Sequence, residues 1–222
     1  MNKLLKLLEE HILSGRDDKS GCITIGINGL DGSGKTFFAE RLLETFTVNH
    51  KNTSIIHVDD FIVPDVLDRV YDSVYRGEFT SDDLDLYYHS ANDMEKLLEA
   101  ITTAKESSDI LLVEGIFLFK PALRDLIDFK IYLDVEKDVA IDRFLARHEI
   151  VGDEVLTATA IFNEVWYASH LKYCSEAEPQ KAADIVIYND FQKPRIAGYS
   201  EQLAWLSEAS GSMEDIQPFA IA

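Results

Sequence analysis

A glycine-rich segment near the N-terminus carries the clearest chemical signal. Residues 29–36, GLDGSGKT, match the pattern G-x-x-x-x-G-K-[ST] at every fixed position. In such a loop, glycines let successive backbone N–H groups turn toward phosphate oxygens, and the start of the following helix adds positive charge. The lysine can reach the β- and γ-phosphates, and the threonine hydroxyl can ligate Mg²⁺. We therefore expect a triphosphate nucleotide to be bound by Gly29, Asp31, Gly32, Ser33, Gly34, Lys35 and Thr36.

Acidic side chains follow two other apolar runs. Asp59 and Asp60 lie near the end of residues 53–61, and Glu114 lies within residues 109–119. In an open parallel sheet, the carboxyl ends of such strands lie beside the phosphate loop. A carboxylate there can accept the proton of an attacking hydroxyl or hold a water on Mg²⁺. We expect Asp59 to do this chemistry, Glu114 to orient a metal-bound water or the substrate, and Asp60 either to face the substrate or to cap a turn.

Two arginines lie four residues apart in a segment with helical spacing. Arg143 and Arg147, within residues 136–149, therefore share one helical face. Exposed arginines are usually solvated, but a segment that closed over the phosphates would stabilise the transferring group and exclude water. We expect both arginines to contact the phosphates, and Arg143 to take part in catalysis with Lys35 and Asp59.

The pattern of apolar runs predicts the elements that position these residues. Strands are expected at 23–27, 53–61, 109–119, 129–135 and 183–188, and helices at 2–14, 37–46, 92–105, 136–149, 160–175 and near 200–207. Strands that alternate with helices predict a parallel sheet with right-handed crossovers. The expected fold class is α/β: a P-loop NTPase with a five-stranded parallel sheet and helices on both faces.

Residues 62–89 break this alternation. The segment is polar, rich in aromatic residues and too long for a plain connection. Its aromatic rings could stack on a base, and its aspartates could bond to sugar hydroxyls. We expect one domain over residues 1–222, in which 62–89 is an acceptor-binding insertion and 137–175 forms a lid and the helix after it. The leucine stripe of residues 2–14 is expected to pack on the sheet, with a seam between copies of the chain as the alternative.

Composition narrows the classes of ligand and location. A net charge of −19 argues against nucleic acid as a partner, because phosphate backbones attract an excess of lysine and arginine. ATP neutralised by Mg²⁺ suits such a chain better than a polyanion. Cys22 and Cys174 have no metal-ligand spacing and are expected as reduced thiols. The N-terminal residues do not resemble a signal peptide, and no apolar run approaches the roughly 20 residues that span a bilayer, so we expect a cytoplasmic protein without membrane contact.

Together these residues resemble the uridine kinase and nicotinamide riboside kinase branch of the P-loop kinases. The resemblance runs from the phosphate loop to the fifth strand and rests on residues 29–36, 57–61, 113–116, 143–147 and 183–187. It implies that Asp59 is the general base for a ribose 5′-hydroxyl, that Arg143 and Arg147 are lid residues touching ATP, and that Asp85 binds ribose hydroxyls. The runs DDF, EGIFLF and VW…LKY look closer to the nicotinamide riboside kinases.

Two classes of function follow. The favoured hypothesis is an ATP- and Mg²⁺-dependent kinase for the 5′-hydroxyl of a uridine- or cytidine-like nucleoside, with nicotinamide riboside or another small alcohol as alternative acceptor. The rival is an NTP-binding regulatory module in which hydrolysis drives a conformational switch. A kinase should fold residues 62–89 into an acceptor pocket facing Asp59, whereas a switch should present them as a surface for a partner.

Overall fold

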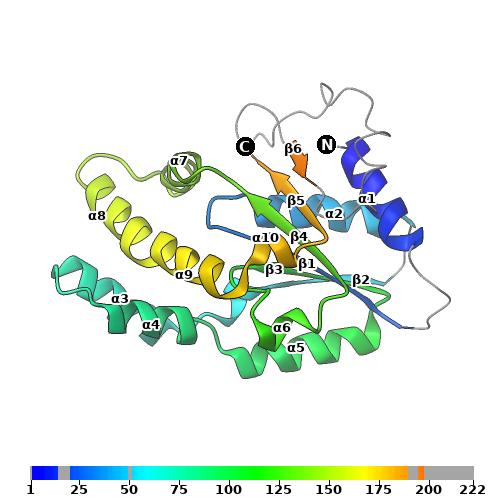
Figure 1. Ribbon diagram of the computed structural model, residues 1–222, viewed down its shortest axis with the longest axis horizontal. Coiled ribbons are helices and arrows are strands. Elements are labelled where there is room, and N and C mark those ends of the chain that lie inside the picture. The colour runs from blue at the N-terminus through cyan, green and yellow to red at the C-terminus, as the bar shows by residue number, and fades with distance from the viewer. Residues whose placement is uncertain (1, 15–20, 50–51, 190–194, 198–222) are drawn as a thin grey trace.

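The computed structural model describes residues 2–14, 21–49, 52–189 and 195–197, and its central feature is a six-stranded sheet (Figure 1). The strand order is β2-β3-β1-β4-β5-β6. Strands β1 to β5 pair in parallel and β6 pairs antiparallel with β5. The strands are β1 (Ile23–Gly29), β2 (Thr53–His57), β3 (Ile110–Gly115), β4 (Phe129–Asp134), β5 (Ile185–Tyr188) and β6 (Arg195–Ala197). The predicted parallel five-stranded sheet is confirmed, and β6 is an addition at its edge.

Helices cover both faces of the sheet, as predicted (Figure 1). Alternate side chains of β3 enter different cores: Ile110 and Leu112 pack with α1 and α2, whereas Leu111 and Val113 pack with the helices of the other face. The helical segments are α1 (Asn2–Ser14), α2 (Lys35–Asn49), a 3-10 turn η1 (Val58–Phe61), α3 (Pro64–Tyr75), α4 (Ser81–Ser90), α5 (Met94–Ser107), α6 (Pro121–Arg124), α7 (Lys137–Arg147), α8 (Glu154–Ile161), a π-helical segment η2 (Phe162–Tyr167), α9 (Ala168–Ala177) and α10 (Pro179–Ala182).

The leucine stripe of α1 is buried within the chain itself. Leu4, Leu5, Leu8 and Ile12 are all at most 7% exposed and belong to the core between α1, α2 and the sheet. The expected packing role is thus confirmed, and these side chains are not available as a seam between copies. Among the described segments, no helix is long and apolar enough to cross a membrane.

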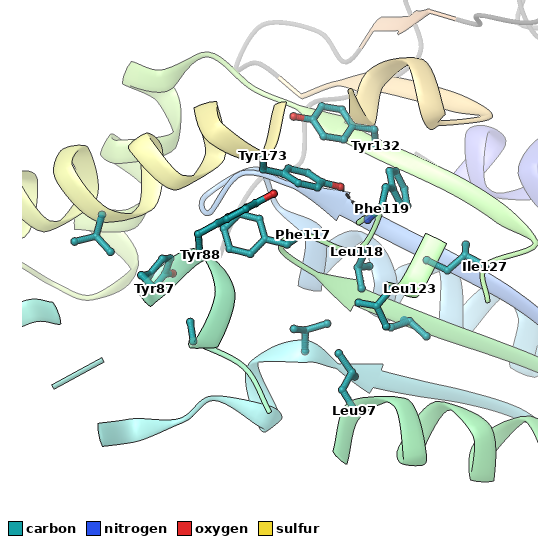
Figure 2. Packing of buried hydrophobic residues seen from close by; sticks show 14 of the residues in the cluster. Tyr87, Tyr88, Leu97, Phe117, Leu118, Phe119, Leu123, Ile127, Tyr132 and Tyr173 are labelled. Atoms are coloured by element: carbon teal, nitrogen blue, oxygen red, sulfur yellow. Dashed lines mark hydrogen bonds between the residues drawn. The ribbon is translucent and has the colours of Figure 1, made fainter. Parts of the chain in front are cut away.

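Two strands are shorter than their apolar runs predicted. Strand β2 ends at His57 and continues as η1, while β3 ends at Gly115, after which Phe117 takes a positive φ of 59°. The chain crowds at this point, because a Cβ at Gly115 would lie 2.4 Å from the Cβ of Val58. Apolar residues continue beyond both strand ends because they enter the core. Tyr88, Phe117 and Tyr173 meet there edge to face (Figure 2).

Residues 62–89, expected to be irregular, form two helices. Pro64 begins α3, and α4 opens with a capping box in which Thr80 and Asp83 exchange side-chain and backbone hydrogen bonds. These helices lie beside α8 and α9 at one end of the molecule (Figure 1). The predicted helix 160–175 is likewise part of a longer run from Glu154 to Ala177. The helix expected near 200–207 lies outside the described residues.

Candidate active site

The phosphate loop is fitted tightly between β4 and α7. A Cβ at Gly29 would lie 2.4 Å from the carbonyl oxygen of Leu133, and one at Gly32 would lie 2.4 Å from that of Ala140. Gly32 also has a φ of +80°, which side-chain-bearing residues rarely adopt. Glycine is therefore required at both positions, for close approach and at Gly32 also for backbone conformation. The contact with Ala140 fixes the first half of α7 against the loop.

Buried asparagines hold the loop from behind. The Oδ1 of Asn28 accepts from the N–H of Gly29 at 2.8 Å, and its Nδ2 donates to the hydroxyl of Tyr173 at 2.5 Å. That hydroxyl also accepts from the backbone N–H of Phe119 (Figure 2). Asn189, which follows β5, donates from Nδ2 to the carbonyl of Ser33 at 2.8 Å and is fully buried. These bonds tie the loop to three other elements and limit its movement.

The lysine of the loop lies within reach of anionic groups. Lys35 is 7% exposed, donates from Nζ to the carbonyl of Leu30 at 3.1 Å, and lies 3.5 Å from the carboxylate of Asp31. These two contacts place the ammonium group of Lys35 at the mouth of the loop, where a phosphate oxygen could replace Asp31 or the carbonyl of Leu30 as its partner.

The hydroxyl and carboxylate expected to serve a metal are directly bonded. Thr36 donates from Oγ1 to Oε1 of Glu114 at 3.1 Å, and Nδ1 of His57 lies 2.6 Å from the same oxygen. Glu114 is only 3% exposed, behind the cavity wall. No cluster of three or more potential His, Cys, Asp or Glu ligands occurs in the described part of the chain. The residues present fit Mg²⁺, which commonly binds through one or two protein oxygens together with phosphate and water.

Asp59 lies in η1 at the carboxyl end of β2 and lines the same cavity as Lys35 and Thr36. Its side chain reaches solvent, but the surrounding protein raises the pKa of its carboxyl group by desolvation. Negative charge on Asp31 and Glu114 raises this pKa further, while Lys35 and Arg147 act in the opposite direction. Such a carboxylate is a stronger base than an ordinary aspartate, which suits proton acceptance.

The cavity has a volume of about 550 Å³ and two chemically different sides. Its cationic lining residues come from the phosphate loop and α7. Arg143 is 5% exposed and donates from Nη1 to the carbonyl of Gly32 at 3.2 Å, whereas Arg147 is exposed one turn later. The remaining lining is largely apolar and aromatic. It is formed by Ile62, Leu67, Tyr71, Tyr87, Ala91, Ile116 and Trp166.

Asn92 adds a polar side chain next to the apolar residues Ile62 and Ala91 of the cavity lining. Its backbone is fixed by a bridge to Ile62, with the N–H of Val63 donating to the carbonyl of Ala91 at 2.8 Å. The Oδ1 of Asn92 is buried and has no hydrogen-bond partner among the described residues. Asn92 was missed from the sequence because it was taken as the first residue of the helix expected at 92–105, which α5 begins only at Met94.

The aromatic lining was predicted in part. Tyr71 and Tyr87 belong to the aromatic cluster expected to form an acceptor pocket, and both line the cavity. Burial raises the pKa of Tyr71 to about 12, and its hydroxyl accepts a hydrogen bond from Nε1 of Trp166 at 3.0 Å. Phe144 was missed as a lining residue because its segment was expected to act on the phosphates, and Trp166 because the helix expected at 160–175 was given no role in the site.

The structure brings most predicted site residues to this cavity and leaves others outside it. Those that line it are Asp31, Gly32, Gly34, Lys35, Thr36, Asp59, Arg143 and Arg147. Gly29 and Ser33 lie within the loop behind it. Asp60 is exposed and outside the lining.

Asp85 also lies away from the cavity, on the exposed face of α4, contrary to its expected contact with ribose hydroxyls. It is two residues from the lining residue Tyr87, which on a helix is a rotation of about 200°. Asp85 instead forms an ion pair with Lys172, and this hydrogen bond lowers the pKa of the Asp85 carboxyl group.

Comparisons with known proteins agree with this geometry. The model of the Phosphoribulokinase / Uridine kinase family matches residues 81–189. A uridine kinase of Leuconostoc citreum is 31% identical over 153 residues, covering 60% of this chain and 70% of that protein. A uridine kinase of Alkaliphilus metalliredigens is 29% identical over 187 residues, covering 74% and 86%. A solved structure described as a possible uridine kinase from Bacillus stearothermophilus has a TM-score of 0.57 and 23% identity, covering 83% of this chain and 97% of that one, and shares the fold.

Proposed function

Because the chain belongs to the phosphoribulokinase and uridine kinase family, we propose that it is an ATP- and Mg²⁺-dependent kinase that phosphorylates the 5′-hydroxyl of a uridine- or cytidine-like nucleoside. The observation that carries this proposal is one cavity in which Asp59 faces the phosphate loop, with an aromatic wall beside it. A hydroxyl held against that wall has a base on one side and a bound γ-phosphate on the other.

The residues divide the work of phosphoryl transfer. Backbone N–H groups of residues 29–36 and the start of α2 bind the phosphates, with Lys35 on the β- and γ-phosphates. Arg143 and Arg147 stabilise the charge on the transferring group. Asp59 takes the proton of the 5′-hydroxyl while the 5′-oxygen forms a bond to the γ-phosphorus. The bond between the γ-phosphorus and the oxygen that leaves with ADP breaks in the same step. Thr36 and Glu114 would hold Mg²⁺, which when bound neutralises charge on the β- and γ-phosphates.

The aromatic part of the lining disfavours an anionic acceptor. The lysine, arginine and histidine residues of the described lining come from the loop, from α7 and from the residue after it: Lys35, Arg143, Arg147 and His148. An acceptor that carried its own phosphate or carboxylate would have no cation on the aromatic side to pair with. A nucleoside base can instead stack on Tyr71, Tyr87 or Trp166 and bond to Asn92.

The placement of residues 62–89 supports a kinase over a nucleotide-driven switch. Leu67, Tyr71 and Tyr87, from α3 and α4, line the cavity. We propose that the chain acts as one domain in which α3 and α4 form the acceptor side, while residues 137–175 supply the lid and the helix after it. Nicotinamide riboside remains the alternative acceptor, because the aromatic wall suits any flat ring.

The experiment is ADP release by the purified protein with Mg-ATP, alone and with each of uridine, cytidine, the purine ribonucleosides, nicotinamide riboside and pantothenate. A uridine- or cytidine-dependent rate of at least about tenfold over the basal rate is expected, with a 5′-monophosphate identified by mass spectrometry. Equal ADP release with and without every acceptor would reject transfer in favour of hydrolysis. A response to nicotinamide riboside alone would reassign the acceptor.

A further inference from the structure

A second recess lies directly behind the aromatic wall of the active-site cavity. It has a volume of about 510 Å³ and shares Tyr71, Phe144 and Trp166 with that cavity. The two spaces are separated by the hydrogen bond from Trp166 to Tyr71, at 3.0 Å, and by the edge-to-face contact of their rings at 6.4 Å. A molecule bound against Asp59 is therefore one aromatic pair away from the recess.

The lining of the recess is suited to an uncharged apolar group. Its own residues are Tyr75, Ile150, Glu154, Thr157, Ala158 and Ile161, from the end of α3, the connection after α7, and α8. Glu154 is the only charged side chain in the described lining, so the recess offers no cation to a phosphate or carboxylate. Tyr75 is 61% exposed although it is aromatic. An apolar occupant would remove this surface from water.

The position of Trp166 depends on a local irregularity of the helix. Trp166 lies in the π-helical segment between α8 and α9. This conformation is rare in proteins, and where it occurs it is frequently at a functional site. From there its ring meets Phe144 edge to face at 4.7 Å and Phe162 at 6.0 Å. The ring therefore packs against α7 through Phe144 and forms a wall common to both spaces.

We propose that this recess is a subsite for an uncharged hydrocarbon substituent on the acceptor, so that base-alkylated or base-arylated nucleosides are better acceptors than the parent compounds. This rests on the proposed function, because the acceptor hydroxyl must reach Asp59. The shared walls argue for a part of the acceptor as the occupant, since Tyr71 and Trp166 line the recess and also belong to the surface on which the acceptor base is proposed to stack. The Tyr71–Trp166 pair opens or shifts to admit the substituent.

The test fills the recess without touching the cavity. Ala158 lines the recess but not the active-site cavity, so the ring of Ala158→Phe should fill the recess. The control is Leu156→Phe on the same helix, because the side chain of Leu156 is 79% exposed and lines neither space. The kcat/KM values are measured for uridine and for its 5-propyl, 5-benzyl and N3-benzyl derivatives. In the wild type and in Leu156→Phe, at least one derivative is expected to exceed uridine by about tenfold, the gain from burying a few methylene groups. Ala158→Phe should abolish this advantage and leave uridine within about twofold.

Two results would overturn the subsite: no derivative better than uridine in the wild type, or an advantage that survives Ala158→Phe. Uridine phosphorylation in the same series shows whether the proposed function itself holds.

A binding readout independent of catalysis uses toluene and the fluorescence of Trp166 in a Trp205→Phe background, which leaves one tryptophan in the chain. A saturable change that Ala158→Phe removes and Leu156→Phe keeps is expected, and a response that is equal in both variants would reject the recess as a binding site.

Discussion

Replacing Asp59 by asparagine separates chemistry from binding and folding. The change keeps the shape of the side chain and removes its basicity. The Asp59 carboxylate makes no hydrogen bond to the described residues, so the substitution breaks no internal contact. Lys35, Arg143 and the loop backbone remain in place to bind ATP. Loss of activity in Asp59→Asn would therefore report on proton transfer.

The expected size of the effect follows from the role. A positioned general base contributes roughly 10²- to 10⁴-fold to the rate, so kcat should fall by about that factor, which corresponds to about 3 to 5 kcal/mol in the barrier. The KM for ATP should change by less than about threefold. With wild-type protein, kcat/KM should rise with pH through a midpoint above the ordinary aspartate value, because burial raises the pKa of Asp59. This acidic limb should disappear in Asp59→Asn.

Asp59→Asn should lose activity without losing folding stability. An acid whose pKa is higher in the folded than in the unfolded chain binds more protons when folded. Its ionisation therefore removes stability as pH rises from the ordinary value through the raised one. At neutral pH the charge of Asp59 is unfavourable to folding, and Asp59→Asn should melt at the same temperature as the wild type or higher.

The assay is steady-state ADP release over a range of pH, together with thermal melting. Asp60→Asn is the matched control, since Asp60 is adjacent, exposed and outside the cavity lining. It should retain full kcat. If Asp59→Asn keeps kcat within about threefold of the wild type, or if Asp60→Asn loses as much, Asp59 is not the base. A marked drop in the melting temperature of Asp59→Asn would refute the electrostatic argument.

Three other substitutions test the binding sides of the cavity. Gly32→Ala should raise the KM for ATP by at least about tenfold, because the added Cβ would lie 2.4 Å from a backbone oxygen of α7. The control is Gly77→Ala, which is also at positive φ but has nothing within 4 Å of the added Cβ and should lose only about 1 to 2 kcal/mol of stability. Asn189→Ala leaves the carbonyl of Ser33 unpaired, so the free energy of unfolding should fall by about 1 to 3 kcal/mol and the KM for ATP should rise while that for the acceptor stays constant. Asn92→Ala should do the reverse, raising the KM for the acceptor about tenfold. Opposite assignments of the two KM effects would contradict this division of the cavity.

The parts of the fold that the sequence could predict depend on local pattern. The phosphate loop combines a fixed spacing with the strand before it and the helix after it, and β-branched runs fit buried parallel strands. The predicted ends of β2 and β3 were too late in the chain. Further apolar residues follow His57 and Gly115, but they enter the core from turns and not from the strands. The helices of residues 62–89 were missed although Pro64 and the Thr80–Asp83 capping box are start signals.

The site could be predicted only where chemistry and sheet topology determine position together. Asp59 follows β2 and Glu114 lies at the carboxyl end of the neighbouring strand β3, so both had to lie near the loop. Asp85 was placed by resemblance, and the rotation of α4 turned it outward. The contact between Asn189 and Ser33 joins residues 156 positions apart. No local signal could have indicated it, because such a bond depends on how β5 ends relative to the loop.

The two arginines of α7 illustrate how an acidic chain can hold a triphosphate. With a net charge of −19, the overall field repels ATP, so binding depends on cations fixed at short range. Arg143 is buried and bonded to the loop at Gly32, and Gly32 also contacts Ala140, about one turn earlier on α7. Arg147, one turn later, is exposed at the mouth. Arg143 thus behaves as a built-in part of the phosphate loop, and any closure over the substrate needs to move only Arg147 and the connection beyond it.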